Sequence, residues 1–279
     1  MIKSLNRILS EPASVSYLIP GYKTGYPSLD SSLGGILDSD LVLIAAKIGN
    51  CSSILLLNLA VGLSSRYHVL LISTIKGAPA VAQELKSVLL PENEKGESDE
   101  DVLNELNRRA CNIFLEDEAH FLEDIEHSIA RFRSEYPAEV IVLIDDLNNI
   151  FLSKEIRTCP RSKEEGDITS NLRMLTLKYS IPILLLTKIE SANPIKKQDP
   201  PSLCDLDHLT GLNTPFNNII GVHLSGSNRI DADEKGLSSG NRLFLHILKN
   251  NNGTSDIIPL TFSDSNKFRL KEEVQNQFE

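Results

Sequence analysis

The sequence predicts an α/β protein with a mostly parallel central sheet flanked by helices and a C-terminal β-hairpin. Three observations support this prediction. Short apolar runs without polar alternation, such as residues 41–46 (LVLIAA), are typical of strands buried on both faces. These runs alternate with helix-like segments, which is the pattern of a parallel sheet covered on both sides. Finally, Asn251-Asn252-Gly253 predicts a tight turn between the last two strands.

The expected elements follow one another from residue 40 onward. The expected strands cover residues 41–46, 68–73, 112–116, 140–145, 182–187, 219–224, 243–249 and 257–262. The expected helices cover residues 53–65, 78–90, 121–135 and 166–180. We therefore divide the chain into an N-terminal arm, residues 1–20, and a single domain, residues 21–279.

The arm carries a short apolar stripe. Ile2, Leu5, Ile8 and Leu9 fall on one face of a helix, which predicts a short amphipathic helix followed by a linker. A frayed terminus is the alternative interpretation. Pro20-Gly21 marks a turn into the main domain.

Composition and charge exclude several classes of protein. The 279 residues are 41% hydrophobic and 24% charged, which excludes collagen-like and disordered chains. The net charge of -10 argues against a wholesale nucleic-acid-binding surface, although a local basic patch remains compatible with it. The four cysteines are scattered and no signal-like segment precedes the domain, so we expect reduced thiols and a cytoplasmic location. The apolar runs are too short to span a bilayer, so no membrane partner is expected.

The turn after the first core strand lies where doubly wound sheets bind phosphates, and it reads AKIGNCSS over residues 46–53. In the frame G/A-x4-G-K-[ST], Ala46 is the first small residue, Ser53 is the final hydroxyl and Gly49 lies between them. Cys51 replaces the second glycine, and Ser52 replaces the lysine that neutralises phosphate. An ordinary strand–helix turn is therefore the alternative interpretation.

An acidic strand end supplies a second candidate feature. The apolar run over residues 140–145 ends in Asp145 and is followed by Asp146, which is the form of a Walker B strand. Such an aspartate can hold magnesium together with the loop hydroxyl, here Ser53. A solvated pair of carboxylates is the alternative.

The ordered set of motifs resembles the C-terminal motor domain of DnaB-type replicative helicases, a RecA-like P-loop NTPase fold of superfamily 4. Residues 24–36 (TGYPSLDSSLGGI) are similar to the family's TG(F/Y)xxLDxxLGGL, and residues 143–148 (LIDDLN) are similar to its VIDYLQ. Residues 201–206 (PSLCDL) resemble PxxSDLR, and residues 248–253 (LKNNNG) occupy the place of AKQRNG. The resemblance covers residues 16–270. Only the arm is expected in place of the family's N-terminal helical domain.

The resemblance implies a nucleotide site with ATP and magnesium as ligands. Of the implied functional positions, only Ser53, Asp145 and Lys249 match. The lysine of the phosphate loop falls on Ser52, the catalytic acid on Ile75, the arginine finger on Asn251 and the phosphate-sensing glutamine on Lys188. Because phosphoryl transfer depends on positioning and charge, we expect no hydrolysis by this chain alone. We expect no cofactor either, except ATP and magnesium if the altered site still binds them.

The resemblance also implies loops that bind single-stranded DNA, which correspond to residues 152–166 and 190–204. Their basic side chains are Lys154, Arg157, Arg161, Lys163, Lys196 and Lys197. Such clusters can follow a phosphate backbone, but solvated loop charge is the alternative, since no aromatic residue is interleaved with the lysines.

We therefore expect an inactive paralogue that acts as a binding or regulatory module for a replicative helicase or another replication protein. By itself it is expected to be a monomer or a weak oligomer, since a stripe of four aliphatic residues buries less than a stable interface needs. The alternative is a functional ATP-dependent motor that unwinds DNA in the 5'-3' direction.

Overall fold

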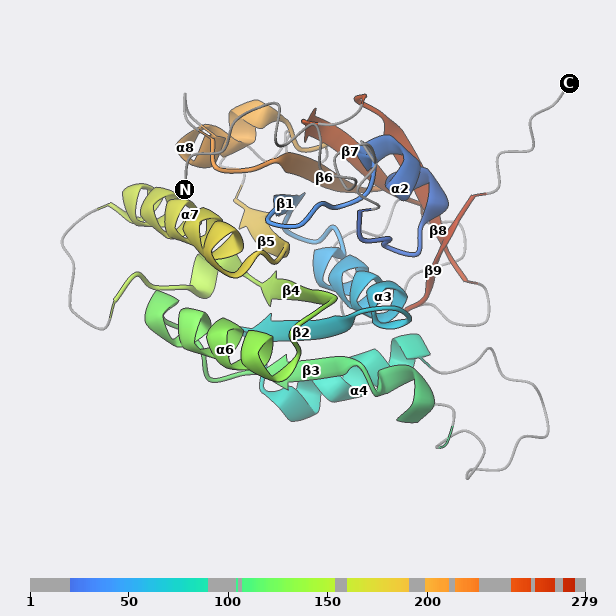
Figure 1. Ribbon diagram of the computed structural model, residues 1–279. Coiled ribbons are helices and arrows are strands. Elements are labelled where there is room, and N and C mark those ends of the chain that lie inside the picture. The colour runs from blue at the N-terminus through green and yellow to red at the C-terminus, as the bar shows by residue number, and fades with distance from the viewer. Residues whose placement is uncertain are drawn as a thin grey trace, which may run out of the picture.

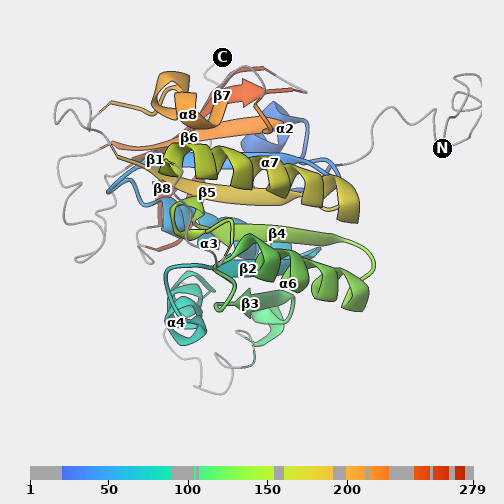
Figure 2. The ribbon, with the colours of Figure 1, turned by 90° about the vertical axis from the view of Figure 1, so that its left-hand side faces the viewer.

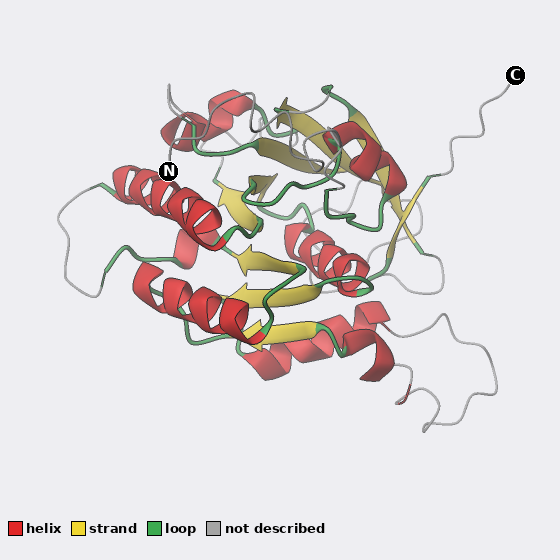
Figure 3. Cartoon of the chain, in the orientation of Figure 1, coloured by secondary structure: helices red, strands yellow, loops and turns green. Residues whose placement is uncertain are grey.

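The computed structural model describes residues 21–89, 104, 107–153, 160–190, 199–210, 214–225, 242–251, 254–263 and 268–273. Within these residues, one sheet of nine strands is covered by helices on both faces (Figure 1 and Figure 3). The strand order is β3-β2-β4-β5-β1-β6-β7-β8-β9. The predicted α/β class is confirmed, whereas the proposed arm, residues 1–20, lies outside the described residues.

The strands agree closely with the predicted ones. Their bounds are β1 Leu41–Lys47, β2 His68–Ser73, β3 Ile113–Glu116, β4 Val140–Asp145, β5 Ile183–Ile189, β6 Asn218–Ser225, β7 Arg242–Asn250, β8 Ile257–Phe262 and β9 Leu270–Glu272. The strands from β3 to β6 in sheet order pair in parallel. The remaining strands pair antiparallel, so the predicted C-terminal hairpin is confirmed as β7–β8, and β9 adds a strand of three residues beside it.

Helices cover the two faces of this sheet. Their bounds are α2 Pro27–Leu33, α3 Ser52–Ser64, α4 Ala78–Leu89, α6 Leu122–Glu135, α7 Arg161–Tyr179 and α8 Asp207–Thr210, with short 3-10 turns η2 Leu147–Asn149 and η4 Leu203–Leu206. Helices α6 and α7 lie side by side on one face, and α3 lies on the other (Figure 1 and Figure 2). None of the described helices combines the length and the apolar character needed to cross a bilayer.

The helices differ from the predicted ones mainly at the start of α7 and in the presence of α2. Helix α7 begins at Arg161 rather than at Gly166, because ion pairs from Arg161 to Glu164 and Glu165 stabilise its first turn. Helix α2 is absent from the predicted elements; it has a proline in its first turn and ends at Gly34 in a left-handed conformation.

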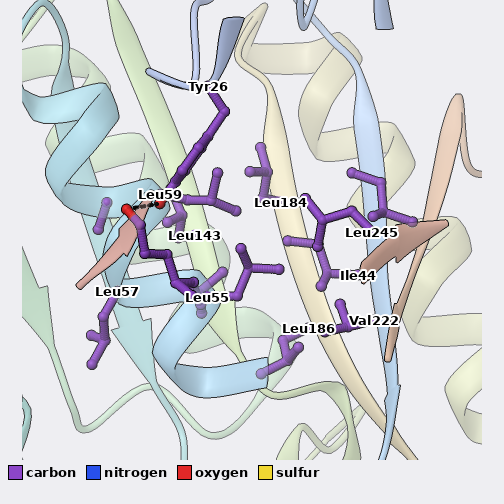
Figure 4. Packing of buried hydrophobic residues seen from close by; sticks show 14 of the residues in the cluster. Tyr26, Ile44, Leu55, Leu57, Leu59, Leu143, Leu184, Leu186, Val222 and Leu245 are labelled. Atoms are coloured by element: carbon purple, nitrogen blue, oxygen red, sulfur yellow. Dashed lines mark hydrogen bonds between the residues drawn. The ribbon is translucent and has the colours of Figure 1, made fainter. Parts of the chain in front are cut away.

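The core consists of two apolar clusters, one on each face of the sheet. Alternate residues of β1 divide between them: Val42 and Ile44 belong to the cluster under α3, and Leu41 and Leu43 belong to the cluster under α6 and α7. Figure 4 shows Ile44 together with side chains of α3 in the first cluster. Strand β1 is thus buried on both faces, as its uninterrupted apolar run predicts.

A close backbone contact joins α3 to the segment that precedes α2. A Cβ atom placed on Gly62 of α3 would lie 2.2 Å from the carbonyl oxygen of Thr24 and 3.6 Å from the Cα of Gly25. Gly25 itself has a φ of 91°. Position 62 therefore accepts only glycine without a shift of the backbone.

We expect Gly62→Ala to lower the free energy of unfolding by about 2 kcal/mol, because the overpacking outweighs the better helix propensity of alanine. Gly166→Ala in α7 is the matched control, since its Cβ would meet only the carbonyl oxygen of His208 at 3.9 Å. That control should gain roughly 0.5–1 kcal/mol. Urea unfolding of both variants measures the difference, and equal stabilities would contradict the close contact.

Candidate functional site

The carboxyl ends of four parallel strands meet at one edge of the sheet. Ala46 of β1 lies opposite Lys188 of β5, and Ser73 of β2 lies opposite Asp145 of β4. The loop after β1 and the acidic end of β4 therefore share this edge. A cavity of about 320 Å³ opens here, lined by residues 48–54, Leu57, Ile75, Lys76, Glu84, Val88, Lys188 and Phe268.

The loop after β1 is held by contacts within the protein. The Asn50 side chain is buried; its amide donates to the carbonyl of Lys47 at 2.7 Å, and its oxygen accepts from the N–H of Leu224 in β6 at 2.7 Å. Cys51 precedes α3 with a φ of 55°, in the left-handed region. This conformation costs a non-glycine residue roughly 1–2 kcal/mol, so the backbone at position 51 still suits the glycine that the phosphate-loop pattern calls for.

The first residue of α3 is Ser52, at the position of the phosphate-loop lysine. Ser52 is buried and carries no charge, so the loop sends no ammonium group into the cavity. The cavity lining instead includes two exposed apolar side chains, Ile48 and Ile75. Ile75 occupies the position at which the family resemblance places a catalytic acid.

Asp145 is the last residue of β4 and Asp146 follows it directly, so two carboxylates stand at this strand end. The Ser53 side chain lies near the Asp145 carboxylate, so the two expected magnesium ligands do lie together. Burial raises the pKa of Asp145, and the neighbouring charge of Asp146 raises it further, whereas Lys188, Ser53 and Lys76 lower it. The Asp145 Oδ1 atom is buried and has no hydrogen-bond partner among the described residues.

Both lysines that line the cavity have carboxylate partners. Lys76 forms an ion pair with Glu84 of α4, and the Lys188 ammonium lies 3.4 Å from Oδ2 of Asp146. Two lining residues, Glu84 and Phe268, are not among those that the sequence predicts for the site. Both reach the cavity from elements distant in sequence from the loop, and no local motif marks them.

Lys249, the other residue that matches a catalytic position of the family, does not line the described cavity. Lys249, near the end of β7, pairs with Ile219 of β6. Its ammonium donates to the carbonyl of Phe216 at 2.5 Å. Burial lowers the pKa of Lys249, and the charge of Arg173 lowers it further.

Of the basic residues predicted to contact DNA, the structure describes Arg161 and Lys163; Lys154, Arg157, Lys196 and Lys197 lie outside the described residues. The Arg161 guanidinium donates to the carbonyls of Leu147 and Asn148 at 3.0 and 3.1 Å, in addition to its two glutamate partners. Arg161 thus fixes the turn that follows β4, whereas Lys163 is exposed.

This fold and this site define the class of RecA-like ATPase domains. A profile of the DnaB-like helicase C-terminal domain matches residues 21–270, so the chain belongs to that family. No curated protein matches its sequence.

Two solved structures support the same fold. One is described as a DnaB-like replicative helicase and its interactions with primase; it is 21% identical, with a TM-score of 0.77 over 97% of this chain and 68% of that chain. The other is described as an ATPase domain and is also 21% identical, with a TM-score of 0.80 over 98% of this chain and 100% of that chain.

We expect Arg161→Ala to lower the free energy of unfolding by about 2 kcal/mol, because it leaves two carbonyls and the buried Glu165 without their guanidinium donor. Arg161→Lys should restore little of this loss, since an ammonium cannot reproduce the planar fork. The matched control is Lys163→Ala in the same helical turn, an exposed position that should change stability by less than about 0.5 kcal/mol. Chemical unfolding measures both variants. Equal losses of unfolding free energy in Arg161→Ala and Lys163→Ala would show that Arg161 does not stabilise the turn after β4.

Proposed function

We propose that this DnaB-like domain is a catalytically inactive paralogue that serves replication as a binding or regulatory module. The observation that carries the proposal is Ser52 at the first turn of α3, where the family pattern calls for lysine. Phosphoryl transfer depends almost entirely on positioning and charge stabilisation, so the loss of that lysine removes a principal part of the chemistry.

The charges around the cavity point the same way. Its two lysines are paired with Glu84 and Asp146, and Asp145 adds a further carboxylate beside them. A triphosphate in the cavity would therefore meet one lining acid, Glu84, and two lysines that carboxylates already neutralise, without an ammonium from the loop. We infer that the described residues do not fit ATP and that binding is weak or absent.

The partners proposed for such a module follow from the family. A relative of this fold is described as a replicative helicase that interacts with primase, so replication proteins are the first partners to test. We propose that the basic residues Lys154, Arg157, Lys196 and Lys197 give at most a weak contact with single-stranded DNA. We also propose a cytoplasmic location, because the chain belongs to this family.

One observation favours the alternative, a working ATP-dependent helicase motor. Ser53 and Asp145 remain in contact, as a magnesium site requires. The two proposals differ in turnover, which can be measured directly.

We expect calorimetric titration of the purified chain with ATP, with and without magnesium, to give weak or no binding, and we expect no steady hydrolysis. The double variant Cys51→Gly with Ser52→Lys should bind nucleotide measurably, because it relieves the left-handed cysteine and returns an ammonium to the loop. It should still not hydrolyse ATP, because Ile75 supplies no acid. Cys51→Gly alone is the matched control for the backbone. Hydrolysis by the unmodified chain that Asp145→Asn abolishes would establish the motor instead.

We also expect the isolated chain to sediment as a monomer or a weak oligomer at micromolar concentration. An apolar stripe of four aliphatic residues in the arm buries only a few hundred Å², well below the ~1,200 Å² of stable interfaces. Any ring then needs a competent helicase subunit. A stable hexamer of the chain alone, without nucleotide, would contradict this expectation.

A further inference from the structure

The carboxylate of Asp146 is a buried charge that requires compensation. Its side chain is 1% exposed. Oδ1 accepts a hydrogen bond from the side-chain amide of Asn149 at 3.0 Å. Oδ2 has no hydrogen-bond donor among the described residues, and its ionic partner there is the Lys188 ammonium at 3.4 Å. Without that ammonium, the carboxylate would remain buried and uncompensated, which is strongly destabilising.

The backbone on both sides of this ion pair is fixed. The Asn148 side chain forms two hydrogen bonds with the backbone of Lys188. Its Oδ1 accepts from the Lys188 N–H at 2.9 Å, and its Nδ2 donates to the Lys188 carbonyl at 3.2 Å. Thr74, which follows the neighbouring strand β2, holds the other side: its hydroxyl accepts from the Asp146 N–H at 2.9 Å and lies 3.0 Å from the carbonyl oxygens of both Asp145 and Asp146, which share its one proton. Lys188 therefore reaches the acidic pair from an anchored backbone position at the end of β5.

The ammonium also acts on the second carboxylate. The charge of Lys188 interacts favourably with Asp145, and the charge of Lys76 does so more weakly. Lys188 is thus the cation that acts on both acids at the edge where the family pattern places a divalent metal. A metal ion brought to the same carboxylates would be repelled by this fixed charge.

We propose that Lys188 is a tethered cation that takes the place of a divalent metal at the Asp145–Asp146 edge, so that the site is charge-balanced without Mg²⁺. This inference rests on the proposed function, because a fixed ammonium can replace a metal only where no metal-dependent turnover is required. It goes further by assigning a role to Lys188 and by predicting that the site is indifferent to divalent cations. Lys188 acts here on stability and charge, not on a reacting group.

The test compares thermal unfolding of the full chain in EDTA and in millimolar MgCl₂, without nucleotide. The unmodified chain should melt at the same temperature in both. Lys188→Gln should lower the melting temperature by about 3–8 °C in EDTA and should recover part of the loss in MgCl₂, because the acidic pair is then free to bind a metal. The matched control is Lys76→Gln, which removes the other lysine of the cavity from a partly exposed ion pair with Glu84. Because Lys76 acts only weakly on Asp145 and leaves the Lys188–Asp146 pair intact, this variant should lose much less stability and should gain none from MgCl₂.

Two further variants keep the test decisive if Lys188→Gln folds poorly. Lys188→Arg should retain the stability and the indifference to MgCl₂. Adding Asp146→Asn to Lys188→Gln should restore stability in EDTA, because the buried charge is removed along with its partner. Electron paramagnetic resonance with MnCl₂ gives a direct readout, with bound Mn²⁺ expected only in Lys188→Gln.

A rise in melting temperature of the unmodified chain with MgCl₂, or Mn²⁺ bound to it without nucleotide, would overturn the inference. Equal behaviour of Lys188→Gln and Lys76→Gln would overturn it as well. These results are distinct from ATP hydrolysis by the unmodified chain, which would overturn the proposed function.

Discussion

Two adjacent carboxylates at the buried end of β4 impose the constraint around which the candidate site is arranged. Asp145 and Asp146 stand at the carboxyl edge of a parallel sheet, where bulk water cannot solvate them fully. Their neighbours therefore supply the compensation: a hydroxyl from α3, an amide from the turn after β4 and an ammonium from β5. Because these groups come from three different elements, satisfying the acids also fixes how those elements meet.

The loop beside these acids does not depend on a ligand for its shape. Asn50 ties it to β6, and the buried Lys47 lies 3.8 Å from Asp205 of η4. In a nucleotide-dependent site, phosphates and a metal would satisfy some of the polar groups of the loop and of the strand ends. Here Asn50 and Lys47 anchor the loop through contacts within the protein, whereas Asp145 Oδ1 and Asp146 Oδ2 have no hydrogen-bond donor among the described residues.

The sequence predicts the sheet well because its strands are buried on both faces, so an uninterrupted apolar run such as residues 140–145 has few other interpretations. It also predicts that Ser53 and Asp145 converge, since both follow strands of one parallel sheet. It does not predict the partners of the charges. Lys188 meets Asp146 only because β5 pairs beside β4, and Arg161 meets the carbonyls of Leu147 and Asn148 only because α7 packs against the turn after β4. Such pairings depend on tertiary packing, and local pattern carries no signal for them.

The residues that differ from the family motifs at the cavity are consistent with one another in their charges. The family motif VIDYLQ has one acid at this strand end, and here Asp146 adds a second while position 52 lacks the lysine, which would leave the site with excess negative charge. A lysine at position 188 corrects that excess, and its backbone is anchored by Asn148 so that the ammonium faces Asp146. Random decay of a nucleotide site has no reason to provide a matching cation at the right strand end. The arrangement supports the proposal of a domain that keeps the family fold while the protein's own side chains balance the charges beside its cavity.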